Sequence, residues 1–210
     1  MRKTIPLCGQ IGVISDQPNW ELPLNAWSDA RNVTFRGGAW RRAAGQAQIF
    51  DTPTITPYFV MAHQTATKRY WVHAGLEKVF VDDGSVRTEI TPASLFTGAI
   101  EDRWTGGTLN GIMGLTNGKD KPVYWDNNTA NNLATLPGWD ANELCAVLVP
   151  FKNYWVALDI TKSTVRYPYM MKWSSAAVPG SVPTSWDETD VTLEAGESDI
   201  GETGDLLVDS

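Results

Sequence analysis

The sequence Tyr-Trp-Val occurs twice, at Tyr70–Val72 and at Tyr154–Val156, 84 residues apart. Gly111–Met113 lies midway between the two copies in a similar apolar context, which gives a repeat of 42 residues. A period near 42 with two to four short strands per unit is typical of β-propeller blades. The repeat therefore predicts blade-like antiparallel β-units over residues 58–186. A β-sandwich with regularly spaced hairpins is the alternative.

Within the repeat, Trp71, Met113 and Trp155 are taken as equivalent positions. After each of them the sequence predicts a second strand, at Lys78–Val81, Pro122–Trp125 and Tyr169–Trp173. The connection to the third of these strands is longer than the other two. Residues 58–210 hold fewer than four periods of 42. Because a closed propeller needs at least four blades, we expect a propeller that is incomplete in this chain.

Helix signals are weak, since no stretch of about 12 residues keeps a 3.6-residue period without Gly or Pro. The chain contains 10 Trp, 18 Gly and 12 Pro, a bias that is typical of many short strands and tight turns. We therefore expect an all-β fold. The tryptophans either fill the cores between sheets or stack on sugars, and the sequence leaves both interpretations open.

We divide the chain into three parts. Residues 1–57 form an extended N-terminal segment with a hairpin, in which Asn32–Arg36 and Ala39–Arg42 pair across Gly37 and Gly38. Residues 58–186 hold the blade-like units. Residues 187–210 form an acidic C-terminal segment that begins further strands, with a solvated tail as the alternative.

The charge of the chain is concentrated in that last segment. There are 24 acidic and 17 basic side chains, a formal charge of −7, and residues 187–210 contain nine acids and no base. The apolar residues of the segment that would begin strands are Val191, Leu193, Ile200 and Leu206–Val208. The overall acidity disfavours generic nucleic-acid binding by the surface as a whole.

The two cysteines, Cys8 and Cys145, belong to no metal-binding pair. They are either two free thiols in a reducing compartment or one long-range disulfide. Pro6 and Gly9 interrupt the apolar stretch near the N-terminus, so we expect no export signal. No run approaches the roughly 18 apolar residues of a membrane helix, and we expect no membrane insertion.

The sequence shows no catalytic, cofactor-binding or metal-binding constellation, so we expect no cofactor and no enzyme activity. The histidines, His63 and His73, accompany neither a nucleophile elbow nor a zinc motif. His73 alternates with Trp71 along a strand, which favours a surface or interblade hydrogen-bonding role. Asp82–Gly84 and Asp126–Asn128 are interpreted as turns rather than as calcium loops.

Several segments resemble, in order, the tail nozzle or tail hub proteins of short-tailed (podovirus-type) bacteriophages, some of which are called DNA-stabilisation or tail accessory proteins. The segments are Leu22–Gly38, Arg103–Gly111, Leu136–Trp139, Pro150–Tyr154 and Pro183–Asp187. The resemblance implies a structural protein of the virion tail with a β-propeller component, assembled in the host cytoplasm. It also implies a homo-oligomeric ring, usually a hexamer, below the portal and adaptor, contacting other tail proteins and enclosing the channel for genome ejection and retention. Members of the family tend to be much longer than this chain.

Two groups of charged residues are candidates for these contacts. Interface candidates, for acidic partner surfaces, are Arg31, Arg36, Arg41 and Arg42, with a solvated hairpin face as the alternative. Candidate channel-facing acids are Asp187, Glu188, Asp190, Glu194, Glu197 and Asp199. Carboxylates facing a channel would repel DNA phosphates, so that viral DNA passes without sequence-specific contact. The alternative function is a glycan-binding β-rich module that uses exposed Trp and Tyr.

Overall fold

The computed structural model describes residues 10–201 except 38, 46 and 49. These residues form 16 strands and no helix, and no helix that could cross a membrane is found among them. Two compact units divide the chain, one up to residue 49 and one from residue 50 onward. The predicted all-β fold class is confirmed.

The first unit contains a parallel pair and an antiparallel hairpin. Strand β1 (Gly12–Val13) pairs with β2 (Ala26–Trp27), and β3 (Val33–Arg36) pairs with β4 (Ala39–Arg42). The hairpin predicted at these residues is therefore confirmed. The Trp27 ring packs against the rings of Phe35 and Trp40 at centroid distances of 5.9 and 5.8 Å.

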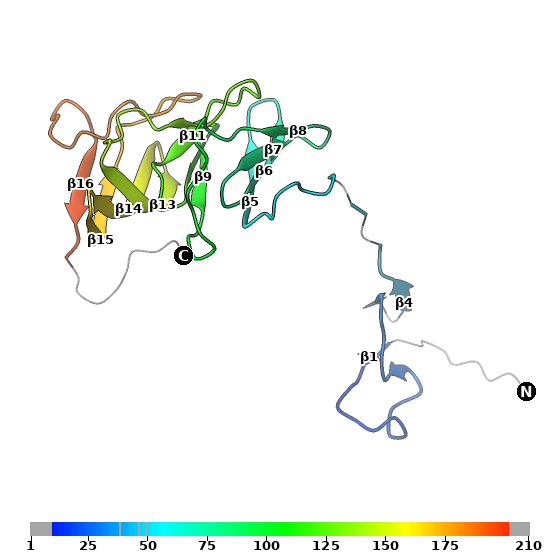
Figure 1. Cartoon of the computed structure of the whole chain (residues 1–210). Coiled ribbons are helices and arrows are strands. Elements are labelled where there is room, and N and C mark those ends of the chain that lie inside the picture. Colours follow the sequence, from blue (N-terminus) through cyan, green and yellow to red (C-terminus); the bar gives the residue numbers. More distant parts are fainter. Residues whose placement is uncertain (1–9, 38, 46, 49, 202–210) are drawn as a thin grey trace, which may run out of the picture. The chain divides into compact units, whose positions relative to one another are not determined.

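The second unit consists of three four-stranded antiparallel sheets that follow one another along the chain (Figure 1). The first sheet contains β5 (Phe59–Gln64), β6 (Arg69–Ala74), β7 (Val79–Asp82) and β8 (Arg87–Glu89). The second contains β9 (Thr105–Leu109), β10 (Ile112–Thr116), β11 (Val123–Trp125) and β12 (Ala134–Thr135). The third contains β13 (Glu143–Phe151), β14 (Tyr154–Lys162), β15 (Val165–Trp173) and β16 (Gly196–Asp199).

Each sheet is a simple meander, in which sequential strands are neighbours, as in a propeller blade. The repeat positions Trp71, Met113 and Trp155 all lie in the second strand of their sheet. Turn chemistry accounts for the Asp- and Asn-rich loops. The Asp82 and Asp83 carboxylates accept backbone N–H bonds from Gly84, Ser85 and Val86, as expected for side chains that stabilise a turn.

Two details of the third sheet differ from the sequence expectation. The strand expected at Tyr169–Trp173 begins at Val165, directly after a short turn from β14, so the expected long connection was wrong. The long connection instead joins β15 to β16. The acidic segment supplies β16, which completes the third sheet, whereas Val191, Leu193 and Ile200 lie outside strands. Leu206–Val208 and Cys8 lie outside the described residues.

The core is divided into two clusters, one on each side of the second sheet. The first cluster joins Tyr70, Val72 and Val81 of the first sheet to Met113, Leu115 and Trp125 of the second. The second cluster joins the second sheet to the third through Leu109, Leu136, Leu148, Trp155, Ala157 and Ile160, with Trp139 and Trp186 from loops. All five residues of β10 are buried, because this strand lies between two other sheets. Five of the ten tryptophans are buried in these cores.

Candidate functional site

The stack of three sheets ends in two faces that no further sheet covers within the described residues. Met113 packs against the first sheet, and Trp155 packs against the second, where its ring lies so close to Gly114 that a Cβ there would be 2.7 Å from it. The repeat position therefore points toward the preceding sheet. Trp71 occupies the same position in the first sheet, where no sheet precedes it, and is 38% exposed.

The residue after each repeat position points the other way, since side chains alternate along a strand. Val72 is fully buried against the second sheet, and Gly114 lies under Trp155 of the third sheet. Val156 is the corresponding residue of the third sheet, where no sheet follows, and it is half-buried beside an open groove. We call the uncovered face of the first sheet the leading face and that of the third sheet the trailing face.

The trailing face carries an apolar groove of about 360 Å³. Its lining residues are Phe151, Tyr154, Val156, Met171, Trp173 and Glu194. Glu194 accepts a hydrogen bond from the Tyr154 hydroxyl at 3.0 Å, and the Trp173 indole N–H donates to the Glu194 carbonyl at 2.7 Å. Phe151 is 58% exposed. Only one side chain in this groove carries a charge, so the groove favours an apolar partner.

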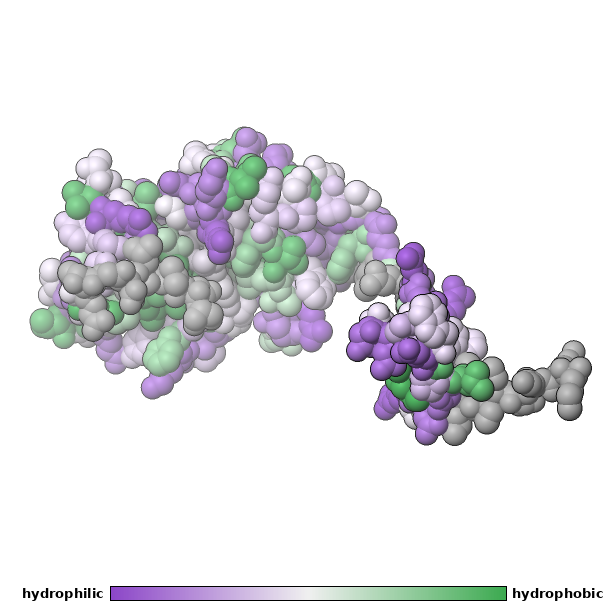
Figure 2. Space-filling view, turned by 90° about the horizontal axis from the view of Figure 1, so that it is seen from below, coloured by the Kyte–Doolittle hydropathy of each residue, from purple (hydrophilic) through white to green (hydrophobic). Residues whose placement is uncertain are grey.

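The leading face is covered in part by the chain that enters the first sheet. Phe50 packs edge-on against Trp71 and His73, and the Arg87 guanidinium donates hydrogen bonds to the carbonyls of Asp51 and Thr52. Val60, on the same face as Trp71, remains half exposed. Figure 2 shows that hydrophobic residues reach the surface of the larger unit in separate patches among hydrophilic ones.

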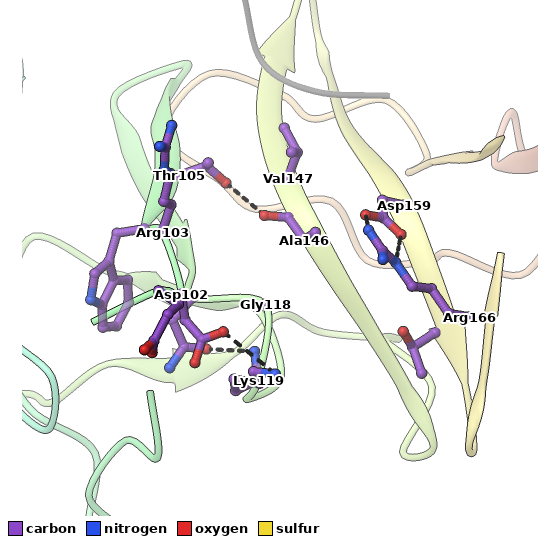
Figure 3. Close-up of a pocket in the computed structure, with 13 residues that line it drawn as sticks. Asp102, Arg103, Thr105, Gly118, Lys119, Ala146, Val147, Asp159 and Arg166 are labelled. Atoms are coloured by element: carbon purple, nitrogen blue, oxygen red, sulfur yellow. Dashed lines mark hydrogen bonds and ion pairs between the residues drawn. The ribbon is translucent and has the colours of Figure 1, made fainter. Parts of the chain in front are cut away.

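A cleft of about 600 Å³ lies where the second and third sheets meet. In Figure 3, Asp102 and Lys119 lie on one side of this cleft, and Asp159 and Arg166 lie on the other. Lys119 pairs with Asp102 at 3.4 Å, and the Arg166 guanidinium donates two hydrogen bonds to Asp159. These four charges neutralise one another, which makes the cleft a poor candidate for binding an ion.

The third sheet contains a buried ionic cluster. The Lys172 ammonium is 2.9 Å from Glu143, 3.3 Å from Glu188 and 3.8 Å from Glu197, and its side chain is only 4% exposed. Lys162 joins the cluster through Glu143 and Glu197. Burial alone would lower the pKa of Lys172, but the hydrogen bond and charge of Glu143 and the charge of Glu188 raise it. Sequence analysis missed Lys172 and Glu143, which carry no local motif.

The six acids expected to face a channel occupy several environments. Glu188 and Glu197 pair with lysines in the ionic cluster, and Glu194 lies at the groove. Asp187 and Asp190 accept hydrogen bonds from Thr189 and Thr192 in turns, and Asp199 accepts one from the Gly201 N–H. Hydrogen bonds from Thr189 lower the pKa of Asp187.

The four candidate interface arginines lie on or beside the β3–β4 hairpin. The antiparallel register places Thr34 opposite Arg41 and Arg36 opposite Ala39, so Arg36 and Arg41 share one face and Arg42 lies on the other. Arg31 is 4.0 Å from Asp29, and both side chains are largely exposed. The structure therefore brings two of the four arginines to one face of the hairpin.

His63, rather than His73, makes the hydrogen bonds between sheets. Its Nδ1 lies 2.7 Å from the Thr108 hydroxyl, and its Nε2 lies 2.6 Å from Asn127 Oδ1. Because the Asn127 amide nitrogen donates to the Gly111 carbonyl, Nε2 carries the proton and Nδ1 accepts from Thr108. His73 was expected to form hydrogen bonds at the surface or between blades; it is instead buried under Phe50, and its Nε2 has no partner among the described residues.

We expect the stability of the protein to fall as the pH decreases from about 7 to about 5. Burial lowers the pKa of His63, although the hydrogen bond to Asn127 opposes this effect. Burial also lowers the pKa of His73, helped by Arg87. Since the unfolded histidines gain protons below about pH 6.5 while the folded ones stay neutral, the stabilisation present above that pH is lost on acidification.

Urea unfolding across this pH range measures the effect. His63→Gln should make the free energy of unfolding less dependent on pH, and His73→Gln should remove a separate part of the same dependence. Equal pH dependence in the wild type and in both variants would contradict the assignment.

Cys145 is fully buried in the third sheet as a free thiol. Burial raises the pKa of the Cys145 thiol to about 12, so it stays protonated and unreactive at neutral pH. No group of three or more His, Cys, Asp or Glu side chains that could hold a metal ion occurs in the described part of the chain. No protein-family model and no curated protein matches this sequence.

Proposed function

We propose that the protein is a structural subunit of the tail of a short-tailed bacteriophage, in the nozzle or hub ring that encloses the channel for genome ejection and retention. The observation that carries the proposal is the stack of three blade-like sheets with two uncovered sheet faces. Uncovered apolar sheet faces are typical of proteins that bind partners, because burial of such faces stabilises an assembly. The proposed role is mechanical rather than enzymatic.

The candidate interface arginines and the candidate channel acids have different roles in this proposal. Arg36 and Arg41, on one face of the hairpin, would contact acidic surfaces of the portal, the adaptor or another tail protein. Four of the candidate channel acids form no ion pair within the described residues and would be the ones to repel DNA phosphates, namely Asp187, Asp190, Glu194 and Asp199. Glu188 and Glu197 would contribute less, because each pairs with a lysine of the ionic cluster.

Immunogold labelling of purified phage particles tests the proposal. An antibody against this protein should place gold at the tail, on every complete particle, and tailless heads serve as the control. Labelling of the head alone, or no labelling of particles that contain the protein by mass spectrometry, would contradict a tail role.

A glycan-binding module is the alternative, and it predicts that oligosaccharides quench tryptophan fluorescence. Five tryptophans are buried, and the exposed indoles are divided between the units, with Trp20 and Trp40 in the first and Trp71 in the second. The burial of five tryptophans in the sheet cores favours the structural role, because these indoles cannot stack on a sugar.

A further inference from the structure

We propose that the groove of the trailing face binds an apolar segment of another tail protein that carries one arginine. The guanidinium of this arginine stacks on the Trp173 indole and donates hydrogen bonds to the Glu194 carboxylate. The proposal rests on the tail role proposed above, and it names the chemistry of the partner at one uncovered face. It depends only on residues of β13–β16 and of the loop before β16.

Neighbouring residues hold the Trp173 ring in position. Trp173 lies opposite Gly196 in the register of β15 and β16, and a Cβ at Gly196 would overlap the indole ring. The indole N–H donates to the Glu194 carbonyl at 2.7 Å. Because the N–H already has a partner, the ring presents an aromatic surface to the groove without an unused donor.

The remaining walls of the groove are mostly apolar side chains of β13, β14 and β15. Phe151 lies opposite Tyr154 in the register, and Val156 lies opposite Trp173. Met171 lies two residues before Trp173 in β15, so both side chains are on the same face of the strand. The aliphatic stem of an arginine and its apolar neighbours can pack against these walls, because burial of apolar surface stabilises a complex.

Glu194 is the charged residue of the groove, and it pairs with no cation in the described part of the chain. Its carboxylate accepts a hydrogen bond from the Tyr154 hydroxyl at 3.0 Å and can accept more. The nearby Lys152 ammonium lies 5.4 Å from the centroid of the Phe151 ring and does not pair with Glu194. A cation supplied by a partner would therefore complement the charge of the groove.

Arginine fits this arrangement better than lysine does. Its planar guanidinium stacks on aromatic rings, among which Trp binds cations most strongly, and it donates two parallel hydrogen bonds to a carboxylate. The groove offers both groups together, because the Trp173 indole is hydrogen-bonded to the backbone of Glu194 itself. An arginine here would neutralise Glu194. The acids left to repel DNA would then be Asp187, Asp190 and Asp199.

Titration of the full chain with the blocked peptide acetyl-Leu-Arg-Leu-amide tests the proposal, with nuclear magnetic resonance of the Met171 methyl group as the readout. We expect a dissociation constant of about 1 mM. The lysine version of the peptide should bind about threefold more weakly, and the neutral citrulline version about tenfold more weakly. Equal binding of the lysine version would overturn the choice of arginine, and equal binding of the citrulline version would overturn the role of charge.

Variants of the protein assign the contacts. Glu194→Gln should weaken binding of the arginine peptide about fivefold, and Trp173→Leu should weaken it about tenfold. Glu89→Gln removes an exposed acid of the first sheet and is the matched control, which should bind the peptide as the wild type does. Unchanged binding by Glu194→Gln would contradict the proposed site.

Two further outcomes would overturn the proposal. A Met171 signal that does not respond to the arginine peptide would exclude the site. A Met171 signal that shifts when the protein alone is concentrated would show that another copy occupies the groove rather than a different protein. The tail role itself is decided separately by the gold labelling, which does not depend on the groove.

Discussion

Replacing Trp155 with Ala should destabilise the second unit by about 3–5 kcal/mol, the largest effect expected of any single substitution in this chain. Trp155 is fully buried between the second and third sheets, and its ring fills the space above Gly114. Its indole N–H has no hydrogen-bond partner among the described residues, so packing accounts for its contribution. Trp155→Phe should therefore retain much of the stability. Urea unfolding followed by circular dichroism measures both variants.

Trp71→Ala is the matched control, because Trp71 is the same residue type at the same repeat position without a preceding sheet. Trp71 is 38% exposed and contacts Phe50, so its loss should cost about 1 kcal/mol. Equal losses for Trp71→Ala and Trp155→Ala would contradict the assignment of one open and one covered face.

Replacing Lys172 with Ala should cost about 3 kcal/mol, the second large effect. The ammonium group is buried with Glu143 and Glu188, and its removal leaves the Glu143 carboxylate buried with only Lys162 nearby. The uncompensated charge, rather than the lost attraction alone, is the reason for the large effect. Thermal and urea unfolding at neutral pH measure the loss.

Two further variants separate charge from packing at this position. Lys172→Ala combined with Glu143→Gln should recover part of the lost stability, because the buried carboxylate is removed as well. Lys78→Ala breaks the exposed pair with Glu89, whose side chains are 39% and 41% exposed, and should cost less than about 1 kcal/mol. A Lys172→Ala effect as small as that of Lys78→Ala would show that the cluster contributes little.

The sequence predicted most of the local structure, because short-range patterns determine it. The 42-residue period placed Trp71, Met113 and Trp155 in equivalent strands, and Gly37 and Gly38 located the β3–β4 turn. Asp and Asn side chains that bond to nearby backbone N–H groups act within a few residues, so their turns could be predicted. The strand predicted at Tyr169–Trp173 lies within β15, but the long connection expected before it was wrong, and Nε2 of His73 lacks the hydrogen bond that was expected. Strand length and hydrogen-bond partners depend on neighbouring sheets.

The sequence of β14 contains a signal for the groove. Tyr154, Val156 and Leu158 alternate with Trp155 and Ala157, so both faces of the strand are apolar, as in a strand that is buried on both sides. The ionic cluster had no such signal. The sheet register places Lys162 opposite Glu143 and Lys172 opposite Glu197, and Glu188 reaches Lys172 from the loop before β16, so the cluster depends on contacts between residues distant in sequence.

By itself, then, the sequence determined an all-β chain of repeated units of short strands, since the alternation, spacing and turns that produce such units are local properties. The tertiary structure decided which face of each strand is covered. Trp71 and Trp155 occupy equivalent positions, yet one is exposed and the other is buried, because only Trp155 has a preceding sheet to pack against. Burial of a side chain depends on sheets that are distant in sequence, and local sequence patterns do not describe these. For that reason only the tertiary structure identifies the two uncovered faces.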